Sequence, residues 1–103
     1  MTKKLLFSAL MLLLNICGFA YDFEVGGIYY DCDASNQTVS VTSSSLGGYR
    51  GVVTIPEQVV YNGVTYSVTS ISDEAFYLCW TLTSVSLPNS LISIGDGAFY
   101  GCI

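Results

Sequence analysis

One segment of the chain occurs twice, and this repeat constrains the fold more than any other feature of the sequence. The stretch AFYLC at residues 75–79 recurs as AFYGC at residues 98–102. When residues 67–79 are laid over residues 90–102, eight of thirteen positions are identical, whereas ordinary residue frequencies give about one. A period of about 20 to 29 residues is typical of stacked units that each contribute one short strand and one return segment. The sequence therefore predicts a solenoid.

Each unit is expected to hold a strand with an apolar side and a hydroxyl side. Val85 and Leu87 alternate with Ser84 and Ser86, and successive side chains of a strand point to opposite sides. Pro88 follows and ends the strand, because proline has no N–H for the sheet.

The return segment carries the repeated Ala-Phe pair. Ser72 stands before two acidic residues, Asp73 and Glu74, a pattern that favours a brief helix or 3₁₀ turn. Stacking places equivalent side chains in columns about 4.8 Å apart. The predicted repeat core comprises Ile71, Ala75, Phe76, Cys79, Leu82, Val85, Leu87, Leu91, Ile94, Ala98, Phe99 and Cys102.

The repeat LTSVSLPNSLISIGDGAFYGC resembles the 23-residue leucine-rich repeat of the BspA-like type, which occurs in surface and secreted proteins of host-associated bacteria and some protists. The motif is a strand that ends in Leu-Pro, followed by Ile-x-x-x-Ala-Phe-x-x-Cys, and it covers residues 67–103. The resemblance implies an adhesin that binds extracellular host proteins.

The segment before the repeats, residues 21–66, is expected to form a β-rich cap. Gly26-Gly27 and Asn62-Gly63 lie between alternating stretches and predict two-residue hairpin turns. The overall prediction is a mainly β leucine-rich-repeat solenoid with parallel strands and short helical or 3₁₀ turns, capped by this N-terminal hairpin region. Residues 67–103 hold fewer than the three repeats that stability usually needs, so we expect the chain to be an N-terminal fragment of a longer protein or the product of a truncated reading frame.

The first twenty residues read as a signal peptide. Two lysines precede an apolar run at residues 5–16, and small residues lead up to Ala20, which predicts cleavage after Ala20. A lipoprotein signal at Cys17 is the alternative, although larger residues precede that cysteine. The apolar run is about 12 residues, whereas a membrane span needs about 20. We expect a secreted or cell-surface protein that does not insert into the membrane after cleavage.

Without residues 1–20, the chain has one basic residue, Arg50, and eight acidic residues. Its net charge is therefore 1 − 8 = −7. Phosphate backbones and anionic lipids are bound by Lys and Arg. The charge therefore argues against nucleic acid and anionic membrane as partners.

Catalysis and metal binding find little support. The chain has no His, so a serine or cysteine nucleophile lacks its usual base. The stretch DCDAS at residues 31–35 spaces its side chains like the start of a calcium loop, but Asn36 replaces the required Gly. We predict no enzyme, cofactor or metal. Cys79 and Cys102 are vertical neighbours that could remain thiols or form a disulfide.

The predicted function is protein–protein binding, most directly adhesion to an extracellular host or matrix protein. The candidate ligand-binding surface comprises Thr83, Ser84, Ser86, Tyr77, Trp80 and Tyr100. Two alternatives remain open. One is glycan binding through Trp80 and the tyrosines, since aromatic rings anchor interfaces and also stack on sugars. The other is a purely structural cap or spacer of a longer repeat array.

Overall fold

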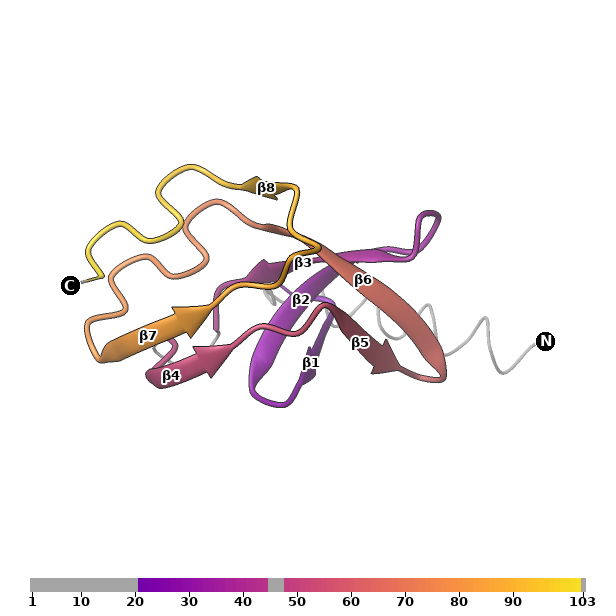
Figure 1. The fold of residues 1–103 in the computed structure, drawn as a ribbon, viewed down its shortest axis with the longest axis horizontal. Coiled ribbons are helices and arrows are strands. Elements are labelled where there is room, and N and C mark those ends of the chain that lie inside the picture. Colours follow the sequence, from indigo (N-terminus) through magenta and orange to yellow (C-terminus); the bar gives the residue numbers. More distant parts are fainter. Residues whose placement is uncertain (1–20, 45–47, 103) are drawn as a thin grey trace.

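The computed structural model describes residues 21–44 and 48–102 as strands and turns (Figure 1). Eight strands follow one another along the chain: β1 (Phe23–Val25), β2 (Ile28–Asp33), β3 (Thr38–Thr42), β4 (Gly51–Thr54), β5 (Gln58–Tyr61), β6 (Val64–Ile71), β7 (Leu82–Ser86) and β8 (Ser93–Ile94). Within these residues no helix is long and apolar enough to cross a membrane. The predicted signal peptide, residues 1–20, lies outside the described residues.

Both predicted hairpins are confirmed. Gly26 and Gly27 join β1 to β2 with φ angles of +60° and +87°. Asn62 and Gly63 join β5 to β6 with φ angles of +52° and +77°. A left-handed backbone at both central residues is what a type I′ hairpin turn requires.

The larger sheet is mixed and curled. Its strand order is β1-β2-β3-β6-β5, and β8 also pairs with β6. The β3–β6 and β6–β8 pairs are parallel, whereas β1–β2, β2–β3 and β5–β6 are antiparallel. The outer strands approach each other, because Phe23 of β1 stacks on Tyr61 of β5 with ring centroids 4.2 Å apart. The uniformly parallel solenoid that we predicted does not describe this sheet, since the N-terminal hairpins add antiparallel strands to it.

Parallel pairing nevertheless relates the repeated segments. Ile71 of β6 pairs with Ile94 of β8, its equivalent in the next repeat, and Val41 of β3 pairs with Ile71 from the other side. A second sheet pairs β4 with β7, also in parallel. Parallel neighbours therefore begin at β3, inside residues 21–66, the segment that the sequence assigned to a cap.

The two repeated turns lie side by side and are not helical (Figure 1). Alternate N–H groups of the first turn bond to the second: those of Glu74, Phe76 and Leu78 donate to the carbonyls of Asp96, Ala98 and Tyr100 at 2.7 to 3.0 Å. The N–H groups between them donate to carbonyls three residues earlier in their own turn. A helix uses all of these donors within its own segment. In place of the predicted helical or 3₁₀ turns, the structure has successive hydrogen-bonded β-turns, because every second N–H group bonds to the neighbouring unit.

A row of aromatic rings runs through the core of both halves. Phe76 is fully buried and stacks on Phe99, with ring centroids 5.0 Å apart. On its other side Phe76 contacts Tyr49 at 4.6 Å, and Tyr49 contacts Tyr29 at 6.4 Å. This row joins the segment before β4 to both repeated turns.

Most of the predicted core positions pack together. Ten are buried or packed against the core: Ile71, Ala75, Phe76, Cys79, Leu82, Val85, Leu91, Ala98, Phe99 and Cys102. Leu87 and Ile94 were wrongly assigned to the core, since they are 46% and 49% exposed. Leu87 follows the end of β7, and Ile94 lies on the short strand β8. No segment among the described residues covers either side chain.

Candidate functional site

The hydroxyl side of β7 is exposed next to β4. Val52 pairs with Ser84 and Thr54 pairs with Ser86. All four side chains are exposed, Val52 to 72%. Thr83 is exposed as well, because the register shifts at the start of β4 and leaves Thr83 as an extra residue of β7. The structure thus gathers the three predicted hydroxyl residues of β7 on one face and adds two side chains from β4.

The two candidate tyrosines stack on the outside of the repeated turns. The rings of Tyr77 and Tyr100 have centroids 5.5 Å apart and planes inclined by 16°. They are 43% and 65% exposed, and Trp80 is 70% exposed. Within the described chain, no ring contact joins this pair to Trp80 or to β7. The six candidate residues therefore divide into a hydroxyl face, a tyrosine pair and a separate tryptophan.

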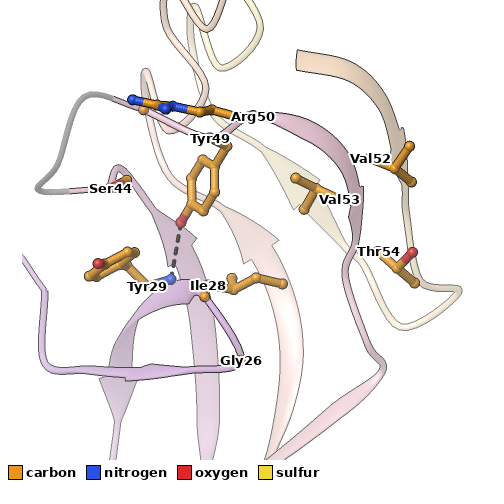
Figure 2. A pocket seen from close by; sticks show the side chains of 11 residues that line it. Gly26, Ile28, Tyr29, Ser44, Tyr49, Arg50, Val52, Val53 and Thr54 are labelled. Atoms are coloured by element: carbon orange, nitrogen blue, oxygen red, sulfur yellow. Dashed lines mark hydrogen bonds between the residues drawn. The ribbon is translucent and has the colours of Figure 1, made fainter. Parts of the chain in front are cut away.

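A pocket of 410 Å³ opens between the β1–β2 turn and β4 (Figure 2). It is lined by residues 26–29 and 52–54 and by Ser44, Gly48, Tyr49 and Arg50. The hydroxyl of Tyr49 accepts the N–H of Tyr29 at 3.0 Å and donates to the carbonyl of Thr42 at 2.5 Å. Burial raises the pKa of Tyr49, so the phenol stays neutral and holds this wall of the pocket in place.

A family model of the BspA type leucine-rich-repeat region, described as comprising six copies, matches residues 53–103. The chain belongs to the BspA-type leucine-rich-repeat family. The resemblance seen in the repeated motif is confirmed, and the match starts before residue 67, within β4.

Two solved leucine-rich-repeat structures share the fold. A leucine-rich repeat protein from Bacteroides ovatus ATCC 8483 is 34% identical over 80% of this chain, with a TM-score of 0.72. A leucine rich cell surface protein from Faecalibacterium prausnitzii A2-165 is 33% identical over 78% of this chain, with a TM-score of 0.65. The chain spans about a fifth of each neighbour, 21% in both cases. No curated protein matches the chain.

Two of the described cysteines of this BspA-type chain, Cys32 and Cys79, have raised thiol pKa values. Cys32, Cys79 and Cys102 are free thiols, and the Cys102 thiol donates to the Phe76 carbonyl at 2.8 Å. Burial raises the pKa of Cys79 and of Cys32, and the charge of Asp22 raises the pKa of Cys32 further. Because the thiolate is the nucleophile and the metal ligand, a raised pKa disfavours both roles.

The carboxylate of Asp33, at the end of β2, accepts hydrogen bonds from the turn that follows it. Asp33 accepts hydrogen bonds from the Ser35 hydroxyl at 2.7 Å and from the Asn36 side-chain amide at 2.8 Å. These bonds lower the pKa of Asp33, which stays ionised. Across residues 21–44 and 48–102, no three His, Cys, Asp or Glu side chains gather in an arrangement that could hold a metal ion.

Sequence reasoning missed Tyr49 and Arg50 as part of a site. Gly48-Tyr49 is a small residue followed by an aromatic one, like Ala75-Phe76 in the repeat. Glycine suits this position, because Gly48 has a φ angle of +93°, and a Cβ there would lie 3.1 Å from the Cys79 sulfur. The similarity between Gly48-Tyr49 and Ala75-Phe76 was missed because the spacing from Tyr49 to Phe76 is longer than the repeat period that separates Phe76 from Phe99.

Proposed function

We propose that this chain is the ligand-binding part of an exported, non-enzymatic BspA-type protein that attaches to an extracellular host or matrix protein. Export is supported by the signal-peptide pattern of residues 1–20 and by the neighbour described as a cell surface protein. The absence of His from the chain and the raised thiol pKa values support a role without catalysis.

The observation that carries the proposal is the exposed face of β4 and β7. In-register pairing sets Val52 beside Ser84 and Thr54 beside Ser86. The face combines apolar area with hydroxyl groups, which can accept and donate hydrogen bonds across an interface. Extended surfaces of stacked units suit large partners. A folded protein is therefore the ligand that this face fits best.

The test is retention of matrix proteins on the immobilised chain. We expect a protein from a solubilised extracellular-matrix extract to bind, and Ser84→Arg to weaken its affinity by about tenfold, or about 1.4 kcal/mol. Thr65→Arg is the matched control, because Thr65 is also an exposed strand residue but lies on β6. If no matrix protein is retained above the bare support, or if both variants lose binding equally, the face is not the binding surface.

A second candidate function is glycan binding on the outer turns. It is favoured by the parallel, exposed rings of Tyr77 and Tyr100, since stacked aromatic faces suit sugar rings. Trp80 is the chain's single tryptophan and therefore a selective probe. Quenching of its fluorescence by a polysaccharide, with affinity lost in Tyr100→Ser, would support this function. A chain that only caps or spaces a longer array would bind neither the matrix protein nor the glycan.

A further inference from the structure

Strand β4 has an unpaired edge. The N–H groups of Gly51 and Ile55 donate to the carbonyls of Thr81 and Ser86 at 2.9 and 3.0 Å, toward β7. Because backbone groups alternate in direction along a strand, the N–H groups of Val52 and Thr54 point to the opposite edge. The small sheet consists of β4 and β7, and no other described strand pairs with β4.

The 410 Å³ pocket lies along this edge (Figure 2). Residues 52–54 form one wall and residues 26–29 form the other. Buried apolar side chains face it, since Val53, Ile28 and Tyr49 are each less than a tenth exposed. The volume falls within the range of about 300 to 1,000 Å³ typical of ligand pockets.

A second pocket, also of 410 Å³, continues the first one past the end of β4. The two pockets share Gly26, Ile28 and Thr54. The second pocket adds apolar side chains that include Val60, which is 59% exposed. Together they make a groove that starts at Arg50 and ends at an apolar site.

Arg50 is the only Lys or Arg in residues 21–44 and 48–102. Its side chain is exposed at the rim of the first pocket (Figure 2), and no carboxylate of the described chain forms an ion pair with it. A guanidinium binds a carboxylate through two parallel hydrogen bonds. Arg50 therefore adds a charge preference to a groove whose other lining residues are uncharged.

We propose that this groove binds an extended segment of a partner protein, which adds as a strand to the free edge of β4. An acidic side chain of the partner pairs with Arg50, and an aliphatic side chain about four residues away fills the second pocket, since strands rise about 3.3 Å per residue. Main-chain hydrogen bonds supply affinity and the two side chains supply specificity, as in other strand-addition complexes. A second copy of this chain fits poorly, because each copy without residues 1–20 has a net charge of 1 − 8 = −7 and like charges oppose association. The groove shares Val52 and Thr54 with the outward face of β4 and β7, but Ser84 lies only on that face and Arg50 only on the groove. Ser84→Arg therefore tests the face, and Arg50→Gln tests the groove.

The test selects phage-displayed random peptides on the whole immobilised chain. We expect enriched peptides to carry an acidic and an aliphatic residue about four positions apart. Arg50→Gln should weaken their binding about tenfold, with a smaller salt dependence. Thr54→Pro should abolish binding, because proline removes the N–H that points away from β7 and leaves in place the N–H groups of Gly51 and Ile55 that bond to β7. Thr54→Val keeps that N–H but changes the side chain, so the loss that Thr54→Pro shows beyond Thr54→Val measures the contribution of the N–H.

Amide exchange measured by NMR tests the same contact without a substitution. Addition of an enriched peptide should slow exchange of the Val52 and Thr54 amides at least tenfold, while the amides of β7 change little. The proposal is overturned if no enriched peptide distinguishes the chain from Arg50→Gln and Thr54→Pro, or if protection appears on β7 instead. It is also overturned if the chain self-associates in sedimentation and Thr54→Pro makes it monomeric, because a second copy would then occupy the groove.

Discussion

Tyr49 connects the N-terminal half to the repeats with a single side chain. Its hydroxyl bonds to the backbone of Tyr29 and Thr42, and its ring lies 4.6 Å from Phe76. The side chain is 5% exposed, so water cannot readily replace the hydroxyl as a partner. Tyr49 therefore contributes both polar and apolar contacts to one junction.

Replacement of Tyr49 by Phe should separate the two contributions. The ring remains, but the Tyr29 N–H and the Thr42 carbonyl lose their partner, which costs about 1 to 3 kcal/mol for a buried polar group. The measurement is the free energy of unfolding in urea. Tyr77→Phe is the matched control, because Tyr77 is 43% exposed and surface changes usually stay within about 0.5 kcal/mol. Equal losses in both variants would contradict the role assigned to the Tyr49 hydroxyl.

At the scale of elements, the repeated turns are held together by backbone contacts at close range. The Asp96 N–H donates to the Asp73 carboxylate at 2.8 Å, across one repeat period. Gly95 permits this approach, because a Cβ there would lie 2.5 Å from the Asp73 nitrogen and 2.8 Å from its Cα. The turns can stack this tightly only where the second one lacks a side chain.

Gly95→Ala should therefore destabilise the chain. The added methyl group meets backbone and not a flexible side chain, so the turns must separate, at a cost of about 1 to 3 kcal/mol. Ser72→Ala is the matched control, since Ser72 occupies the equivalent place in the first repeat and already has a Cβ. The urea midpoint of each variant gives the comparison. A Gly95→Ala chain as stable as Ser72→Ala would show that the turns are not packed as described.

The repeat period predicts which side chains stack on each other better than it predicts the backbone conformation of the turns. Phe76 over Phe99 follows from identical residues one repeat period apart, and the structure has this stack. The non-helical β-turns could not be predicted, because the hydrogen bonds from Glu74 and Leu78 to the next turn depend on backbone direction and leave no signature in the residue types. The exposure of Leu87 likewise depends on which segments cover it.

The candidate sites divide in the same way. The hydroxyl face of β7 follows from strict alternation of Ser84 and Ser86 with apolar residues, a local pattern. The pocket beside Arg50 did not follow, because it forms between residues 26–29 and 52–54, which are distant in sequence. Local patterns can predict which side of a strand is exposed. They do not predict which segments enclose a pocket.

At the scale of the whole molecule, the N-terminal segment and the repeats share one hydrophobic core. The side chains of Tyr30 and Tyr49 are buried in this core. Tyr30 is 1% exposed, and burial raises its pKa to about 12. Burial raises the pKa of Tyr49 as well. An unfolded tyrosine ionises near pH 10, so the folded state disfavours ionisation that the unfolded chain permits.

Stability should consequently fall in alkali, and the sign follows from proton binding. Both phenols are raised above their unfolded pKa, so their contribution is complete below about pH 10 and is lost as the pH rises toward the folded value of about 12 for Tyr30. Each phenol lowers the free energy of unfolding by up to about 1.4 kcal/mol per pH unit in that interval. The measurement is the urea midpoint between pH 8 and pH 12, at roughly one-unit steps, with tyrosinate absorbance recorded in parallel. Tyr30→Phe should flatten the decline, because the phenol whose pKa burial raises is then gone. A decline as steep in Tyr30→Phe as in the unchanged chain would place the titrating group elsewhere in the molecule.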